Sequence, residues 1–259
     1  MNIVAIANQK GGVGKTTTAL NLGTALAAKG HNVCLIDLDP QGNLSEYLQY
    51  KSDGDPTMAE LMTLISTGEL KNELCAISIR HSEVNNVDYV PADISLAGAE
   101  QRIITALSRE TILKRLLAYP CFSKYDYIII DCLPSLGILL VNALTVANNI
   151  IMPSQTQKFS ADGLASLTEL VKQVKATLNP ELKMCGIVPT MVDNTNVSKN
   201  AIAKFREEYG ADVCQTVIHR SVEACKSSEM GKALTLTKNK LGMEYVALAD
   251  ELERKMNNG

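Results

Sequence analysis

The fold of this chain is decided by one stretch of its sequence, Gln9-Lys10-Gly11-Gly12-Val13-Gly14-Lys15-Thr16-Thr17. An apolar run at 2–8, which indicates a buried strand, precedes it, and an Ala/Leu-rich run with helical spacing follows it at 18–29. A strand, a glycine-rich loop and a helix in this order are the context of a phosphate-binding loop. The glycines let backbone N–H groups converge on one point, and the following helix directs the positive end of its dipole there.

Two side chains of this stretch suit a nucleotide bound with Mg²⁺. Lys15 supplies a mobile positive charge for the β- and γ-phosphates, and Thr16 supplies a hydroxyl ligand for the cation. The usual Walker pattern G-x-x-x-x-G-K-[ST] requires glycine where this chain has Gln9, and it does not require a second lysine, Lys10, beside the loop. Because spacing and context agree, a chance glycine-rich turn is the weaker interpretation.

Length and composition predict one large domain. The chain has 259 residues, of which 46% are hydrophobic and 20% charged, so a single α/β domain over 1–259 can bury a sizeable core. A net charge of −3 excludes general attraction to nucleic acid or anionic membranes, and any such binding must be local. We expect no membrane span and no cleaved leader. The seven cysteines are scattered without a C-x-x-C pair, which indicates free thiols in a reduced cytosol.

Strand and helix patterns alternate along the whole chain. Strands are expected at 2–8, 32–38, 125–131, 148–153, 182–190 and 215–220, with weaker candidates at 77–82 and 86–91. Helices are expected at 18–29, 45–50, 57–66, 92–100, 109–117, 157–178, 198–209 and 241–256. This alternation predicts a doubly wound α/β fold with a mostly parallel sheet flanked by helices.

Aspartates follow two of the predicted strands. Asp39 lies in the loop after 32–38, and Asp131 ends the strand 125–131. Ligands bind at the carboxyl ends of parallel strands, so beside a phosphate-binding loop both carboxylates are candidates for the Mg²⁺ site. Asp131 fits a Walker B position. Asp39 by itself would be better explained as a capping aspartate in a turn, but next to a nucleotide its carboxylate can also orient or deprotonate an attacking water.

These motifs together resemble those of the ParA/MinD family of deviant Walker A ATPases, and its ParA/Soj-type partition ATPases in particular. The likeness is strongest at 10–17, 37–43 and 125–137, and it extends over nearly the whole chain. The resemblance implies the P-loop NTPase fold, ATP and Mg²⁺ as cofactors, and hydrolysis of ATP to ADP and phosphate. It makes Asp39 the catalytic aspartate of switch I. In the segment that resembles switch II, Leu133 stands where the family commonly has proline.

The resemblance further implies an ATP-dependent homodimer. Each signature lysine, here Lys10, reaches the nucleotide of the partner and joins Lys15 and Asp39 in the catalytic set, while Gly11 lies where the two backbones pass closely. Asp193, which follows the strand 182–190, is the aligned candidate to read adenine, and an ordinary loop aspartate remains the alternative there. The phosphates would be bound by Gly11, Gly12, Val13, Gly14, Lys15, Thr16 and Thr17.

In this family the dimer binds double-stranded DNA without sequence preference, and a ParB-type partner triggers hydrolysis and release. The resemblance makes Arg220 the first DNA-binding candidate, with Lys199 and Lys204 as further ones. Two positions that are usually basic hold Glu223 and Thr195 instead. From 196 to 240 there are eight Lys/Arg against five Asp/Glu, which favours one basic face, although a solvated surface of mixed charge is the alternative.

A partition function implies a cytoplasmic, nucleoid-associated protein with no membrane partner. Two alternatives stay open, namely a ParA-like positioner of protein cargo and a MinD-like membrane-cycling ATPase. The second needs a basic amphipathic helix at the carboxyl end, and the acidic residues within 241–256 fit that requirement poorly. A metabolic P-loop enzyme is a more remote alternative.

Overall fold

The computed structural model describes residues 1–156 and 161–258. Its strands are β1 Asn2–Ile6, β2 Val33–Leu38, β3 Arg80–Ser82, β4 Val87–Val90, β5 Tyr127–Cys132, β6 Asn149–Gln155 and β7 Lys183–Thr190. Its helices are α1 Lys15–Ala28, α2 Asn43–Tyr47, α3 Met58–Thr67, α4 Asn72–Ile77, α5 Ser95–Ile103, α6 Ile112–Leu117, α7 Ile138–Val146, α8 Ala161–Thr177, α9 Asn196–Tyr209, α10 Glu223–Glu229 and α11 Lys240–Asn258.

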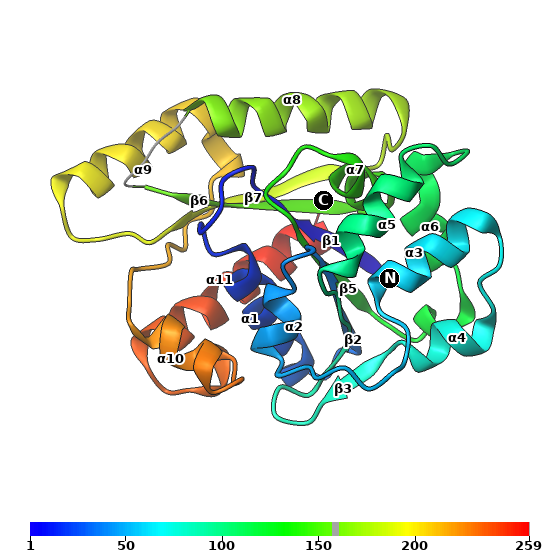
Figure 1. Cartoon of the computed structure of the whole chain (residues 1–259). Coiled ribbons are helices and arrows are strands. Elements are labelled where there is room, and N and C mark those ends of the chain that lie inside the picture. The colour runs from blue at the N-terminus through cyan, green and yellow to red at the C-terminus, as the bar shows by residue number, and fades with distance from the viewer. Residues whose placement is uncertain (157–160, 259) are drawn as a thin grey trace.

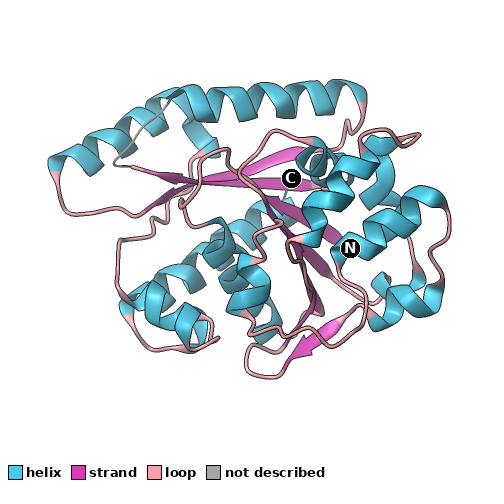
Figure 2. Cartoon of the chain, viewed as in Figure 1, coloured by secondary structure: helices cyan, strands magenta, loops and turns pink. Residues whose placement is uncertain are grey.

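The strands form one sheet in the order β3-β4-β2-β5-β1-β6-β7. Neighbouring strands are parallel, except that β3 runs antiparallel to β4. Helices cover both faces of the sheet, as Figures 1 and 2 show, so the predicted α/β fold class is confirmed. At the centre, β1 and β5 are in register up to the pair Ile6 and Asp131. The loop after β1 and Asp131 therefore lie at the same edge of the sheet.

Alternate residues of the central strands build a separate core on each face. In β1, Ile3 and Ala5 pack into the cluster that includes α3, α5, α6, α7 and α8, whereas Val4 and Ile6 pack into the cluster that includes α1 and α11. This is the period of two expected of a strand buried on both faces. Within the described residues, no helix has both the length and the apolar character needed to cross a bilayer.

Three helices were not predicted from the sequence. In each case there is a physical reason why the sequence pattern did not reveal the helix. α7 is apolar on all sides and lacks a helical stripe, because it is buried among its neighbours. α4 and α10 are too short to show a period. The predicted strand at 77–82 is wrong at its start, since Ile77 ends α4 and β3 begins at Arg80. The helix predicted at 157–178 is α8, which begins at Ala161, and its first residues lie outside the described ranges.

The predicted strand at 215–220 is also wrong. In the described part of the chain, this segment and the residues before it form two isolated bridges with β7 and the loop after it, Ile187 with Val213 and Val192 with His219. The N–H of Ile218 also donates to the carbonyl oxygen of Pro189 at 2.9 Å. The segment runs alongside the sheet edge without forming a continuous ladder.

Carboxylates of α11 hold the backbone of this segment. Glu251 accepts hydrogen bonds from the backbone N–H groups of Gln215 at 2.7 Å and Thr216 at 2.8 Å, and Glu244 accepts one from the N–H of His219 at 2.9 Å. Burial alone would raise the pKa of Glu251, but the two N–H donors lower it. The N–H groups of Cys214, Ile218 and Arg220 point to β7 and the loop after it, so of the donors bound by α11 only the N–H of Thr216 is one that a ladder with β7 would have used.

Replacing Glu251 with alanine is expected to destabilise the protein by roughly 1–3 kcal/mol, because two partly buried N–H groups lose a charged acceptor. The Glu251→Gln variant keeps one carbonyl acceptor and should lose less. Urea unfolding measures the free energy of unfolding of both variants. The matched control is Glu207→Ala, which changes an exposed glutamate on α9. Equal midpoints for Glu251→Ala and the control would show that these hydrogen bonds do not hold the segment.

Candidate functional site

The glycine-rich loop joins the end of β1 to the start of α1 at the carboxyl edge of the sheet (Figure 1). Gly12 and Gly14 have φ angles of 69° and 90°, in the left-handed region that favours glycine. These two residues let the chain reverse before α1 begins at Lys15. The amino-terminal N–H groups of α1 therefore face the loop, in the arrangement that binds phosphate groups.

Two buried side chains that the sequence analysis did not single out hold this loop in place. Asn8 donates to the carbonyl oxygen of Pro153 at 2.7 Å and accepts from the N–H of Lys10 at 2.9 Å. Thr190 donates through its hydroxyl to the carbonyl oxygen of Val13 at 2.8 Å. For Asn8 the sequence held a signal of this role, because a polar residue stands at the end of an apolar run. The role of Thr190 had no such signal, because its partner is far away in the sequence.

Thr16 and Asp131 meet at the head of α1. The hydroxyl of Thr16 donates to Oδ2 of Asp131 at 2.6 Å. Oδ1 of Asp131 is buried and has no hydrogen-bond partner within the described residues. Burial raises the pKa of Asp131, and the negative charge of Asp37 raises it further. A hydroxyl beside an unsatisfied carboxylate oxygen fits Mg²⁺, which prefers oxygen ligands and relieves the repulsion between acidic groups.

The two lysines of the loop point to different partners. Lys15 is 7% exposed, and its Nζ donates to the carbonyl oxygen of Lys10 at 3.4 Å. Burial lowers the pKa of Lys15, while the charges of Asp131 and Asp39 act in the opposite direction. Nζ of Lys10 donates to Oε1 of Gln155, at the end of β6, at 3.2 Å. Lys15 therefore belongs to the acidic interior of the site, and Lys10 lies along its outer side.

The loop after β2 is held by its own aspartates. Oδ1 of Asp39 accepts a hydrogen bond from the N–H of Gln41 at 2.9 Å. The carboxylate of Asp37 accepts hydrogen bonds from the backbone N–H of Ser45 at 2.8 Å and from the Ser45 hydroxyl at 2.7 Å. The Ser45 hydroxyl in turn accepts a hydrogen bond from the N–H of Ala92 at 2.9 Å. These contacts tie the loop that carries Asp39 to the loop after β4, so its carboxylate has a defined orientation.

Asp193 and Arg220 line one pocket of about 340 Å³ beside the end of β7. The carboxylate of Asp193 accepts hydrogen bonds from the N–H of Thr195 at 3.1 Å and from its hydroxyl, which forms the turn before α9. The backbone N–H of Arg220 donates to the carbonyl oxygen of Val192 at 2.9 Å. The structure thus brings together two residues that the sequence analysis assigned to different ligands, adenine and DNA.

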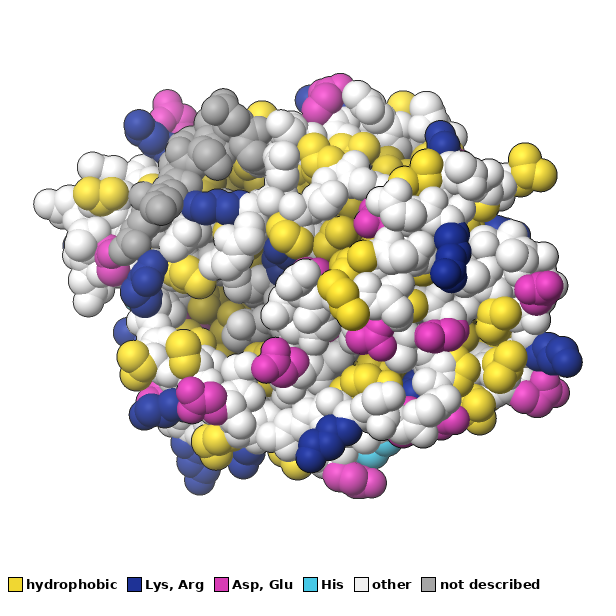
Figure 3. Space-filling model, in the orientation of Figure 1, with side chains coloured by type: hydrophobic (Ala, Val, Ile, Leu, Met, Phe, Trp, Pro, Cys, Tyr) yellow, Lys and Arg dark blue, Asp and Glu magenta, His cyan; other side chains and the backbone are white. Residues whose placement is uncertain are grey.

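Lys199 and Lys204 lie on the exposed side of α9 and do not line this pocket. Thr195 caps α9 by accepting the N–H of Ser198 at 3.3 Å, and Glu223 forms an ion pair with Lys226 at 2.8 Å. Figure 3 shows basic and acidic side chains interspersed over the visible face. The charge of Glu223 is therefore partly balanced locally, and the visible face carries mixed charge.

Known proteins resemble this chain over most of its length. A family model described as an AAA domain matches residues 1–184. The sporulation initiation inhibitor protein Soj of Bacillus subtilis is 39% identical over 254 residues, covering 96% of this chain and 97% of Soj. The chromosome partitioning protein ParA of Myxococcus xanthus is 38% identical over 256 residues, covering 98% of this chain and 88% of that protein.

A solved structure agrees with the fold. The crystal structure described as cobyrinic acid a,c-diamide synthase from Mycobacterium smegmatis with bound ADP and magnesium superposes with a TM-score of 0.85 at 33% sequence identity. The match covers 100% of this chain and 96% of that chain.

Proposed function

Because the chain belongs to the ParA/Soj family of partition ATPases, we propose that it is an ATP-dependent, dimerising switch that partitions plasmid or chromosomal DNA. In this proposal the dimer binds double-stranded DNA without sequence preference, and a ParB-type partner triggers ATP hydrolysis and release. The protein would then act in the cytoplasm, associated with the nucleoid. The near-complete coverage of Soj supports the proposal at the level of the whole chain.

The observation that carries the ATPase part is the unsatisfied buried oxygen of Asp131 beside the hydroxyl of Thr16. A buried carboxylate oxygen without a partner is costly, so a ligand that completes it is favoured. Thr16 and Asp131 would hold Mg²⁺, which neutralises phosphate charge when bound. The N–H groups of the loop and Lys15 would hold the phosphates themselves.

Asp39 and Lys10 would supply the remaining chemistry. The N–H of Gln41 fixes one oxygen of Asp39, so the carboxylate is oriented to receive a proton from the attacking water. Lys10 would exchange its hydrogen bond with Gln155 for a phosphate of the partner's nucleotide. This exchange is possible only across a face-to-face dimer.

Replacing Gly11 with valine is expected to leave ATP binding unchanged and to block the ATP-dependent dimer. Gly11 is exposed, a Cβ built on it meets no atom within 4 Å, and its φ is outside the left-handed region, so the monomer has room for the new side chain. In the proposed dimer the branched side chain would fill the space between the two loops. Light scattering with ATP measures the mass, and Gly11→Ala gives a graded comparison. A valine variant that still dimerises would contradict the face-to-face arrangement.

Replacing Arg220 with glutamate is expected to weaken ATP-dependent binding to all DNA duplexes alike, by roughly tenfold at moderate salt. Each lost phosphate contact also lowers the slope of log affinity against log salt by about 1. Filter binding across a salt series, with ATP and with ADP, measures both effects. Duplexes of unrelated sequence should be weakened equally, because contacts to phosphates carry no sequence information.

The shared pocket of Arg220 and Asp193 requires three controls. Nucleotide affinity of Arg220→Glu, measured by calorimetry, separates loss of DNA binding from loss of ATP binding. Lys199→Glu tests the basic segment away from the pocket, and Lys114→Glu on α6 repeats the charge change elsewhere. If Arg220→Glu loses ATP affinity and Lys199→Glu binds DNA normally, Arg220 belongs to the nucleotide pocket instead. No ATP-dependent DNA retention at low salt by the parent protein would refute the DNA part of the proposal.

One observation speaks against the membrane-cycling alternative. The apolar face of α11, including Leu241, Leu248 and Leu252, is buried in the core against α1 and is not presented to a lipid surface. Glu244 and Glu251 on the same helix hold the segment before α10. Sedimentation with anionic liposomes in ATP should therefore leave the protein in the supernatant.

A further inference from the structure

Two of the seven cysteines, far apart in the sequence, meet in the fold. All seven are free, and Sγ of Cys75 lies 3.1 Å from Sγ of Cys121, which is 46 residues further along the chain. Cys75 is buried in α4, whereas Cys121 is partly exposed in the short 3₁₀ helix η2, Pro120–Phe122. The two sulfur atoms are within about 1 Å of the length of a covalent S–S bond.

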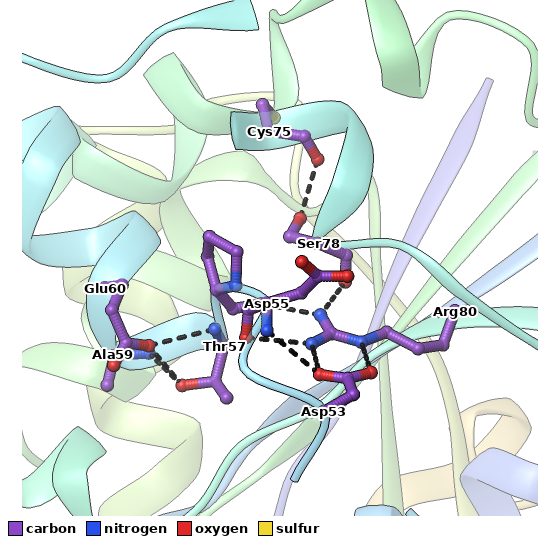
Figure 4. A network of polar contacts seen from close by, with 9 residues as sticks. Asp53, Asp55, Thr57, Ala59, Glu60, Cys75, Ser78 and Arg80 are labelled. Atoms are coloured by element: carbon purple, nitrogen blue, oxygen red, sulfur yellow. Dashed lines mark hydrogen bonds and ion pairs between the residues drawn. The ribbon is translucent and has the colours of Figure 1, made fainter. Parts of the chain in front are cut away.

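Hydrogen bonds on both sides hold this pair in place. The hydroxyl of Tyr119 donates to the carbonyl oxygen of Leu70 at 2.8 Å and joins the residues before η2 to those before α4. At the other end of α4, the hydroxyl of Ser78 donates to the carbonyl oxygen of Cys75 at 2.6 Å, and Arg80 donates to that of Ser78 at 2.6 Å (Figure 4). The fold therefore fixes the two backbone segments that carry the sulfur atoms, so most of the entropy of closing a loop between them is already lost.

The two thiols differ in access and in acidity. Cys121 lines a surface pocket of about 420 Å³ together with His81, Asp88 and Lys124. The hydrogen bond between the thiols lowers the pKa of Cys121, and Lys124 lowers it further. The same hydrogen bond, together with burial, raises the pKa of Cys75. The accessible thiol is thus the more acidic one, which suits it to attack first.

We propose that Cys75 and Cys121 form a dithiol site that a small-molecule disulfide of the glutathione type oxidises to an intramolecular disulfide. The Cys121 thiolate attacks one sulfur of oxidised glutathione, which gives a mixed disulfide and releases one glutathione thiolate. Cys75 then loses its proton and attacks Sγ of Cys121, and the second glutathione leaves and takes up a proton. The protein gives up two electrons and two protons, and the oxidant becomes two thiols.

The bridge would lie away from the nucleotide site. η2 precedes the amino end of β5, whereas the glycine-rich loop follows the carboxyl end of the parallel neighbour β1, so the two sites are at opposite edges of the sheet. Oxidation should therefore stabilise the fold, because it restricts the unfolded chain, without changing affinity for ATP.

The test uses the full chain in buffers with a graded ratio of oxidised to reduced glutathione. After acid trapping and alkylation in denaturant, mass spectrometry should find two of the seven thiols lost and a peptide that links Cys75 to Cys121. The midpoint of thermal unfolding should rise by on the order of 10 °C and return to its original value with dithiothreitol.

Three variants make the test specific. Cys121→Ser should keep all its remaining thiols and show no thermal shift. Cys75→Ala should accumulate a glutathione adduct on Cys121, because no second thiol resolves it, and Cys225→Ser, which removes an exposed cysteine, should behave as the parent. The proposal is overturned if all seven thiols persist in oxidised glutathione, if another pair is linked, or if the parent stops at the Cys121 adduct.

Discussion

Replacing Lys15 with alanine is expected to remove most of the ATP binding, with a loss of affinity of about 30-fold to several thousandfold. Lys15 is buried among Asp131, Asp39 and the carbonyl oxygen of Lys10, and it is the charge inside the loop that faces the proposed phosphate position. Removing one partner of a buried, hydrogen-bonded charge pair costs about 2–5 kcal/mol, which backbone N–H groups alone do not replace. Calorimetric titration with ATP and Mg²⁺ measures the loss.

Unfolding is a separate outcome that the design must exclude. Lys29→Ala changes the lysine that directly follows α1, at its far end, where it pairs with Asp250 and Glu253, and this control should bind ATP as the parent does. A cooperative thermal transition without nucleotide, above the temperature of the titration, would show that Lys15→Ala is still folded. A folded Lys15→Ala protein with parental affinity would show that the loop does not bind the nucleotide through this residue.

Replacing Asp39 with alanine is expected to slow ATP hydrolysis by roughly 10²–10⁴-fold, the usual contribution of a general base, while ATP binding persists. Asp39 is 7% exposed, and the N–H of Gln41 orients its carboxylate, which is assigned to the attacking water and not to holding the phosphates. Gel filtration with ATP should show a dimer that does not decay, since the proposed release step follows hydrolysis. Phosphate release measured over hours gives the rate.

The Asp39→Asn variant separates the two roles of the carboxylate. Its amide oxygen can still accept the N–H of Gln41, but it cannot take a proton from water. If the asparagine variant hydrolyses ATP as slowly as the alanine variant, the charge or basicity of the carboxylate is required. Recovery of the rate in the asparagine variant would mean that Asp39 acts only by shaping its loop.

Local signals were sufficient for much of the fold and for the centre of the site. Glycines at 12 and 14 are favoured by the positive φ of the loop, and Asp131 near the end of the apolar strand β5 places a carboxylate at the ligand-binding edge of a parallel sheet. The alternation of strands and helices predicted the doubly wound sheet. Such features depend on backbone geometry and on periods of a few residues, which neighbouring residues in the sequence determine directly.

Contacts between distant residues were decided only by the tertiary structure. The sequence predicts a strand at 215–220, but Glu251 of α11 takes two of its N–H groups. Thr190 reaches Val13 across 177 residues, and Asp193 and Arg220 share a pocket although they were assigned to different ligands. The physical reason is that packing of helices onto the two faces of the sheet chooses these partners, and a partner chosen by packing leaves no periodic trace in the sequence.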